Sequence, residues 1–194
     1  MNQSKLTLRR QLRTVRNSFS STLRAEHNAA IGQHLYELVI SRRADSIACY
    51  WPFNGEPDIT PACRRLMAGG CRLSLPVVTG NNGHEMNFHS WREDTRLNKN
   101  MYGILEPQDT ELVPISSLDV LFMPLVGYDR FGNRLGMGAG YYDRCLETTR
   151  DLPAPLRVGI AYSLQEIDRV ESEQWDIRLH GVVNEHGWVG FAGQ

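Results

Sequence analysis

Residues 119–144, DVLFMPLVGYDRFGNRLGMGAGYYDR, decide the fold of this chain. The segment begins with an apolar run, 119–126, which predicts a strand that is buried on both faces, as in a parallel sheet. A glycine-rich loop follows at 127–140, and the pattern at 140–149 predicts a helix. Ligands of α/β sheets bind at the carboxyl ends of the strands, where this loop would lie. We therefore expect a ligand site at this loop.

The rest of the chain alternates predicted helices with predicted strands. Helices are expected at 4–17, at 23–40 with Ser20, Ser21 or Thr22 as the cap, and from the cap and first-turn pair Thr60-Pro61 to the stop at Gly69-Gly70. Strands are expected at 46–53, 72–78, 85–91 and 157–162, with a short pair at 182–183 and 188–189. This alternation predicts an α/β fold, a single three-layer, Rossmann-like domain over 1–194 whose mainly parallel central sheet is flanked by helices.

The composition excludes several classes of protein. The chain has 194 residues, 41% hydrophobic and 22% charged, with a net charge of -1, so no bulk attraction to nucleic acid or to a membrane surface is expected. No apolar run is long enough to span a membrane, and no secretory signal pattern precedes the first helix. The 4 cysteines show no metal-binding spacing and indicate free thiols. We expect a cytoplasmic monomer that acts on small molecules, without a nucleic-acid or membrane partner.

The glycine-rich loop is the strongest functional signal. Gly136, Gly138 and Gly140 allow the backbone to approach a ligand closely, and the amides of such a loop can hold phosphate oxygens. Arg134 precedes these glycines and can pair with phosphate, whereas Asp143 follows them and can hold Mg²⁺. The loop is neither a Walker A loop nor a full GxGxxG fingerprint, so a purely structural glycine turn is the alternative.

A second signal is the basic row Lys5, Arg9, Arg13 and Arg16, which recurs at helical spacing. Four cations on one stripe repel one another unless an anion lies nearby, so the row can cover nucleotide phosphates. The alternative is an ordinary solvated helix face.

Three acidic residues stand near possible ligand positions. Glu56 follows the turn Asn54-Gly55 after a predicted strand, where a carboxylate can accept a hydrogen bond from a ring N–H, and Trp51 can stack on a flat heterocycle. Glu106 is held extended by the following proline, and Asp176 in the sequence EQWD is a second candidate Mg²⁺ ligand. A solvated turn, a structural turn and an unremarkable surface acid are the respective alternatives.

Taken together, these segments resemble one family, the 5-formyltetrahydrofolate cyclo-ligases. The resemblance extends over about 4–183, and the block at 134–144 is its most specific part. The matching segments, in the family's order, are KxxLRxxxRxxR at 5–16, NGEPD at 54–58, GILEP at 103–107, PLVGYD at 124–129 and RLGMGAGYYDR at 134–144. Trp51-Pro52 departs from the family, which more often has small aliphatic residues or serine there.

The resemblance implies specific roles for residues. Arg134 and Asp143 are the implied catalytic residues, and Asp143 and Asp176 the implied Mg²⁺ ligands. The folate substrate would contact Trp51, Glu56 and the segment Met137, Gly138, Ala139, Gly140 and Tyr141. ATP would contact Lys5, Leu6, Thr7, Leu8, Arg9, Arg134, Leu135, Gly136, Met137, Gly138, Ala139, Gly140, Tyr141 and Tyr142.

The implied reaction closes 5-formyltetrahydrofolate to 5,10-methenyltetrahydrofolate with Mg²⁺ and ATP. Phosphorylation of the formyl oxygen would turn it into a leaving group, N10 would attack, and ADP and phosphate would be released. One alternative is another enzyme on a related α/β scaffold, such as a sugar-phosphate isomerase or a CoA transferase, neither of which consumes ATP. The other is a non-catalytic nucleotide- or folate-binding regulator, which would bind tightly without turnover.

Overall fold

The computed structural model describes residues 4–79 and 85–191. The α-helices are α1 (Lys5–Asn17), α2 (Ser21–Arg42), α3 (Thr60–Ala68) and α4 (Tyr141–Leu146), and the 3-10 helices are η1 (Ile115–Ser117), η2 (Glu147–Thr149) and η3 (Ser163–Gln165). The strands are β1 (Ser46–Ala48), β2 (Arg72–Thr79), β3 (Glu85–Trp91), β4 (Leu97–Lys99), β5 (Leu105–Pro107), β6 (Leu112–Val113), β7 (Val120–Pro124), β8 (Gly127–Tyr128), β9 (Arg134–Leu135), β10 (Leu156–Ile160), β11 (Gly181–Asn184) and β12 (Gly187–Gly190).

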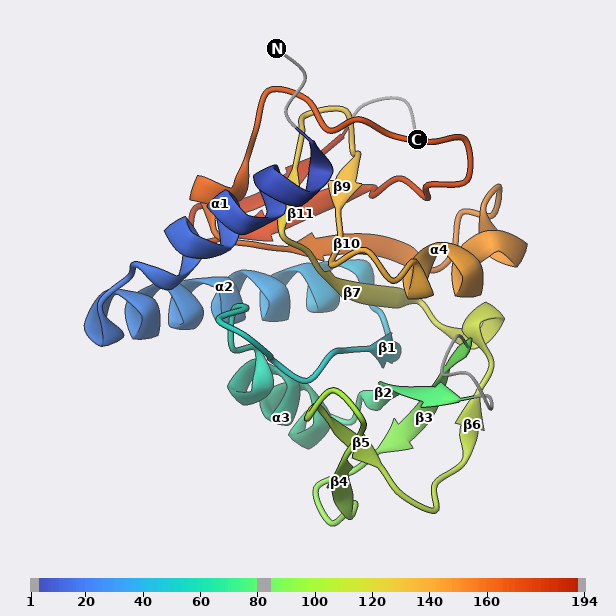
Figure 1. Ribbon diagram of the computed structural model, residues 1–194. Coiled ribbons are helices and arrows are strands. Elements are labelled where there is room, and N and C mark those ends of the chain that lie inside the picture. Colours follow the sequence, from blue (N-terminus) through green and yellow to red (C-terminus); the bar gives the residue numbers. More distant parts are fainter. Residues whose placement is uncertain (1–3, 80–84, 192–194) are drawn as a thin grey trace.

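An eight-stranded sheet forms the centre of the molecule, in the order β12-β11-β10-β7-β1-β2-β3-β6 (Figure 1). The strands from β11 to β2 are parallel to their neighbours, and antiparallel strands close both edges. The prediction of an α/β fold with a mainly parallel central sheet is therefore confirmed. Two small hairpins, β4-β5 and β8-β9, lie outside this sheet.

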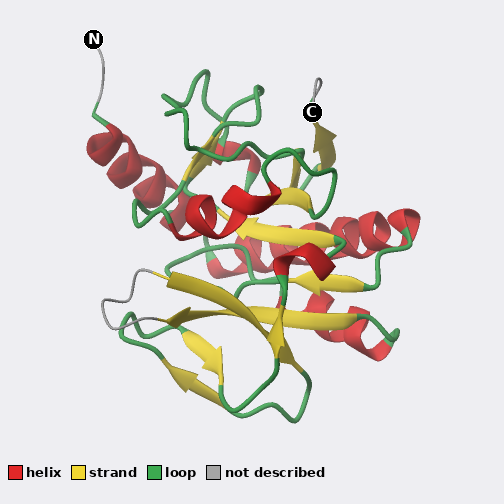
Figure 2. Cartoon of the chain, turned by 90° about the vertical axis from the view of Figure 1, so that its right-hand side faces the viewer, coloured by secondary structure: helices red, strands yellow, loops and turns green. Residues whose placement is uncertain are grey.

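Helices cover both faces of the sheet, as Figure 2 shows in red in front of and behind the strands. The alternation along β7 explains this arrangement: Val120 and Phe122 join the core beneath α2 and α3, whereas Leu121 and Met123 join the core beneath α4. Both faces of β7 are thus buried in apolar side chains, as the unbroken apolar run predicts. No helix within the described residues is both long enough and apolar enough to cross a membrane.

The predicted cap Ser20 is confirmed, Ser4 is a further cap that was not predicted, and two local predictions are wrong. Ser4 and Ser20 cap α1 and α2 by accepting hydrogen bonds from the amides of Thr7 and Leu23, at 3.3 and 3.2 Å. Thr60 is not the cap of α3, because the chain enters that helix at Ile59. The predicted strand 46–53 ends at Ala48, since the chain then leaves the sheet.

The predicted helix 140–149 is also shorter than expected. The α-helix ends at Leu146, and a 3-10 turn continues it to Thr149. Tight 3-10 turns are common at helix ends, where the last carbonyls lack α-helical partners.

Candidate active site

A cleft of about 730 Å³ lies beside the ends of β1 and β7. It gathers segments that are far apart in the sequence, and most of the predicted site residues line it. These are Lys5, Arg9, Trp51, Glu56, Arg134, Leu135, Gly136, Met137, Gly138, Ala139, Gly140, Tyr141, Tyr142, Asp143 and Asp176. A ligand site at the carboxyl end of a central parallel strand is the position expected for this class of fold.

The glycine-rich loop forms one wall of the cleft. Gly138 and Gly140 have φ angles of +108° and +68°, in the left-handed region that residues with a Cβ rarely adopt. Arg9 reaches this loop from α1, and its Nε donates a 2.8 Å hydrogen bond to the carbonyl oxygen of Gly136. The loop therefore follows a path that needs glycine at these two positions, and Arg9 fixes it from α1.

Arg134 and Asp143 meet across the loop. Nη2 of Arg134 lies 2.8 Å from Oδ1 of Asp143, and the two side chains are 6% and 21% exposed. The guanidinium also donates to the carbonyl oxygen of Ile177, whose amide in turn donates to Oδ1 of Asp143 at 2.9 Å. This closed set of contacts joins the glycine loop to the segment that carries Asp176.

A buried carboxylate sets the position of Arg134. Asp129 is fully buried in the turn of the β8-β9 hairpin, and its Oδ1 accepts hydrogen bonds from the amides of Phe131 and Asn133, at 2.9 and 3.0 Å. Its Oδ2 accepts from the Asn133 side chain and from the amide of Val170. Because β9 begins with Arg134, this turn fixes the strand that delivers the guanidinium to the cleft.

Asp143 and Asp176 provide a donor set that suits Mg²⁺. Oδ2 of Asp176 accepts from the amide of Glu173 at 2.9 Å, and Oδ1 of Asp143 is engaged as described above. The other oxygen of each carboxylate accepts no hydrogen bond from the described residues. The described residues contain no group of three or more His, Cys, Asp or Glu side chains that could hold a metal ion by themselves. Mg²⁺ is commonly bound by one or two carboxylates together with water and substrate phosphates, and two carboxylates in one cleft are compatible with that mode of binding.

The basic row on α1 divides between two places. Lys5 and Arg9 line the cleft, and Nζ of Lys5 lies 3.5 Å from Oε1 of Glu173 on the opposite wall. Arg16 is fully buried instead, and its guanidinium donates to the carbonyl oxygens of Leu125 and Asn54, at 3.2 and 2.6 Å. The expectation that the whole row covers phosphates is therefore wrong for Arg16, because tertiary packing draws that side chain under the turn at Asn54.

The turn that Arg16 supports carries Glu56. Arg24 also holds this turn, with its Nη1 2.9 Å from the carbonyl oxygen of Gly55. The Glu56 carboxylate accepts the amide hydrogen of Phe53 at 3.1 Å. Loss of hydration raises the pKa of Glu56 to about 7, although the nearby Arg16 charge and the Phe53 amide act to lower it. Glu56 thus lies in a poorly hydrated part of the cleft wall. A bound hydrogen-bond donor there would stabilise the ionised carboxylate and lower its pKa.

Aromatic side chains complete this end of the cleft. Trp51 is half-buried and packs edge-on against Trp91, with ring centroids 5.9 Å apart. Tyr102 approaches from the loop before β5, and its hydroxyl lies 2.8 Å from the hydroxyl of Tyr141. Burial and this contact raise the pKa of Tyr141 to about 12. The Tyr102–Tyr141 contact joins the loop before β5 to the start of α4 at the cleft.

Glu106 has a structural position rather than a place in the cleft lining. It is buried, and its Oε1 accepts hydrogen bonds from the amide of Val78 and from Nδ2 of Asn100, at 2.9 and 2.6 Å. The Asn100 side chain in turn accepts from the amides of Tyr102 and Ile104. Glu106 therefore fixes the loop that presents Tyr102 to the cleft.

Some residues differ from the sequence prediction. Leu6, Thr7 and Leu8 lie outside the cleft lining, because in a helix only Lys5 and Arg9 share a face four residues apart. The prediction also missed Tyr102, Arg150 and Trp175, which line the cleft. Tyr102 adjoins the GILEP segment and Trp175 adjoins Asp176, so these neighbouring motifs could have indicated that the two residues line the cleft. No local motif in the sequence indicates Arg150.

The sequence matches the model of the 5-formyltetrahydrofolate cyclo-ligase family over residues 1–185. A 5-formyltetrahydrofolate cyclo-ligase of Haemophilus influenzae is 32% identical over 183 residues, which are 93% of this chain and 97% of that protein. A protein of the same name from Escherichia coli (strain K12) is 36% identical over 142 residues, 72% of this chain and 78% of that protein.

A solved structure gives the same result for the fold. The NMR structure of Aquifex aeolicus 5,10-methenyltetrahydrofolate synthetase superposes with a TM-score of 0.84 at 30% identity, and the match covers 98% of this chain and 94% of that one. Sequence family and fold thus agree, and this chain belongs to the 5-formyltetrahydrofolate cyclo-ligase family.

Proposed function

We propose that this enzyme converts 5-formyltetrahydrofolate to 5,10-methenyltetrahydrofolate, with ATP as co-substrate and Mg²⁺ as the metal ion. The observation that carries the proposal is a single cleft with two different ends. The phosphate end has the glycine loop, Arg134 and Asp143, and the folate end has Trp51 and Glu56. A reaction that joins a nucleotide phosphate to a flat heterocycle needs both ends in one cavity.

The chemistry explains why ATP is consumed. A formamide carbonyl is a poor electrophile, and its oxygen is a poor leaving group. Transfer of the γ-phosphoryl group to the formyl oxygen releases ADP and removes both obstacles. N10 of the folate then attacks the formyl carbon and gives up its proton, and the C–O bond breaks to release phosphate as the methenyl bridge forms.

At the phosphate end, the protein's task is to position the reactants and to offset charge. The loop amides of residues 136–140 and the cations Lys5, Arg9 and Arg134 hold the triphosphate. Mg²⁺ on the free oxygens of Asp143 and Asp176 would supply further positive charge there. Because Arg134 is already held by Asp143 and Ile177, its charge is in place before ATP binds.

At the folate end, Glu56 accepts a hydrogen bond from the pterin ring and Trp51 contacts the ring system. A pterin N–H donor stabilises the ionised carboxylate, so folate binding lowers the pKa of Glu56 from its raised value near 7. The carboxylate then fixes the orientation of the ring and directs N5 and N10 toward the loop.

The test follows the methenyl product by its near-ultraviolet absorbance, with purified protein, 5-formyltetrahydrofolate and Mg²⁺-ATP. Product should form only when ATP is present. Product without ATP, or a folded protein that forms none, contradicts the proposal. Turnover of a sugar phosphate or a CoA ester without ATP would instead favour the related-scaffold enzymes, and binding of ATP and folate without turnover would favour the regulator.

A further inference from the structure

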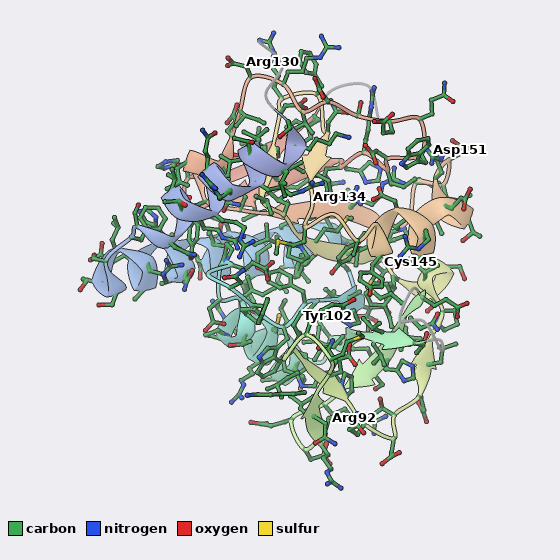
Figure 3. All side chains as sticks on the ribbon, viewed as in Figure 1. Arg92, Tyr102, Arg130, Arg134, Cys145 and Asp151 are labelled. Carbon is green, nitrogen blue, oxygen red and sulfur yellow. The ribbon has the colours of Figure 1, made fainter. Side chains whose placement is uncertain are left out.

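A second pocket of about 830 Å³ adjoins the active-site cleft and shares Arg150, Glu173 and Asp176 with it. Four arginines line this arginine pocket: Arg42 at the end of α2, Arg150 after η2, Arg157 in β10, and Arg178. In Figure 3, Asp151, which also lines the arginine pocket, lies to the right of Arg134, whereas Tyr102 lies below it. The pocket therefore opens near the phosphate end of the cleft.

The four arginines have no carboxylate partners. Within residues 4–79 and 85–191, no carboxylate oxygen lies within 4.0 Å of any of them. Two of the three acidic residues in the lining already have other partners: Glu173 pairs with Lys5, and Asp176 accepts the amide of Glu173. The four guanidinium groups thus form no direct ion pair within the described residues, although the carboxylates of Asp151 and Asp176 in the same lining offset part of their charge.

Arg157 is the central group of this pocket, because it is only 6% exposed. Its Nη1 donates to the carbonyl oxygens of Thr149 and Arg150, at 3.3 and 3.1 Å, but its Nε has no hydrogen-bond partner. Burial, together with the charges of Arg134 and Arg150, lowers the pKa of Arg157, although the charge of Asp151 acts to raise it. Because Nε is sealed from solvent, an anion in the pocket would meet the Nη2 side of this guanidinium, and its charge would offset the cost of burying the cation.

His180 cannot satisfy the remaining donors of Arg157. Its Nδ1 lies 2.8 Å from the Arg157 amide nitrogen, and its Nε2 lies 2.9 Å from Nη2. Burial and the Arg157 charge lower the pKa of His180 to about 4, so the ring is neutral at neutral pH. A neutral imidazole has only one acceptor nitrogen, so one of these two contacts pairs a donor with a donor.

We propose that the arginine pocket binds a tetrahedral oxyanion, and that its ligand is inorganic phosphate. Planar guanidinium groups match the geometry of phosphate oxygens, and several of them around one pocket are typical of a phosphate site. The choice of phosphate over other anions rests on the proposed function, since that reaction releases phosphate in the adjoining cleft. The existence of the site rests only on the geometry of the four arginines.

The test is a calorimetric titration of the full-length protein with inorganic phosphate at low ionic strength, without either substrate. The double substitution Arg42→Ala and Arg178→Ala changes two exposed residues of the arginine pocket that lie outside the cleft. Arg92→Ala is the matched control, because Arg92 is exposed and lies at the opposite end of the molecule in Figure 3. We expect phosphate affinity to fall at least roughly tenfold in the double variant and to stay unchanged in the control.

A second experiment distinguishes phosphate binding in the arginine pocket from phosphate binding in the active-site cleft. Phosphate binding should persist when a non-hydrolysable ATP analogue with Mg²⁺ fills the cleft. Complete competition by the analogue, no phosphate binding by the wild type, or equal affinities in the double variant and the control each overturn the proposal. A γ-linked triglutamate peptide that binds the pocket in place of phosphate overturns the choice of ligand. These binding results do not depend on turnover, so they stand apart from a failure of the proposed reaction.

Discussion

The phosphate end of the cleft comes mainly from one continuous segment, 134–144, whereas the Glu56 end is assembled from distant parts of the chain. At the phosphate end, the loop glycines and the Arg134–Asp143 pair lie within eleven positions of one another. At the other end, Glu56 depends on Arg16 and Arg24, which reach its turn from α1 and α2. The phosphate end is therefore encoded mainly by local sequence, whereas the environment of Glu56 is created by tertiary packing.

The largest effect is expected at the phosphate end. Asp143→Asn removes the carboxylate that pairs with Arg134, and with it a proposed Mg²⁺ ligand. We expect kcat/KM to fall roughly 10²–10³-fold, because the displaced guanidinium and the metal both act on the transferring phosphoryl group. Steady-state rates over a range of Mg²⁺ concentrations measure this loss. Asp168→Asn, an exposed position outside the cleft, is the control, and equal rates in the two variants would contradict the assignment.

Glu56→Gln tests the folate end of the cleft through the pH dependence of kcat/KM. Because the proposed hydrogen bond from the pterin needs an ionised carboxylate, the wild-type kcat/KM for the folate should rise with pH through about 7. The variant should lose roughly 10-fold to 100-fold at pH 8 and show a flat profile over that range. Glu26→Gln on the exposed face of α2 is the matched control. A wild-type profile without an inflection near 7 would contradict the role given to Glu56.

The same substitution has a predicted effect on stability. The folded-state pKa of Glu56 is about 7 against an ordinary value of 4.5, so the folded protein binds the extra proton between these values. The free energy of unfolding contributed by this group therefore falls as pH rises from about 4.5 to about 7. Glu56→Gln should be more stable than the wild type by roughly 1–3 kcal/mol at pH 8, with the difference lost near pH 4.5. Urea unfolding at both pH values measures it.

Two glycine-to-alanine substitutions test the backbone conformation of the loop. Gly138→Ala forces a Cβ onto a residue with φ of +108°, and we expect a loss of about 1–2 kcal/mol in the free energy of unfolding. Gly136→Ala meets no atom within 4 Å and has no positive φ, so it should cost nothing. Chemical denaturation compares the two variants, and equal stabilities would contradict the positive φ of Gly138.

The smallest effect is expected where the two ends meet. Tyr102→Phe removes the hydroxyl contact to Tyr141 but keeps the ring. Because the contact is exposed, we expect only about a two- to tenfold change in the folate KM, with little change in kcat. Tyr36→Phe on α2, which lies outside the cleft, controls for the loss of a tyrosine hydroxyl. A large fall in kcat would instead assign Tyr102 to the chemistry.

The sequence predicted the sheet, the loop and the Arg134–Asp143 neighbourhood, because these depend on short-range patterns. It did not predict the burial of Arg16, whose partner Leu125 is 109 positions away. It also missed Asp129, since a carboxylate in a turn gives no sign that it will be fully buried and hold Arg134 in place. The four arginines of the second pocket come from separate elements and share no motif, so only the folded chain brings them together.

Arg9 and Arg16 of the basic row on α1 reach opposite ends of the cleft, so α1 can link the affinity for one substrate to the binding of the other. Arg9 contacts the phosphate-binding loop and Arg16 supports the turn of Glu56, so one rigid rod of roughly 10 Å joins both ends of the cleft. A nucleotide that shifts or stiffens this rod alters the affinity of the Glu56 end for its ligand. By thermodynamic reciprocity, the folate alters the affinity for the nucleotide by the same factor. Coupling between the two substrates, measured as the change in affinity for one when the other is bound, would therefore run through the contacts that α1 makes at both ends of the cleft.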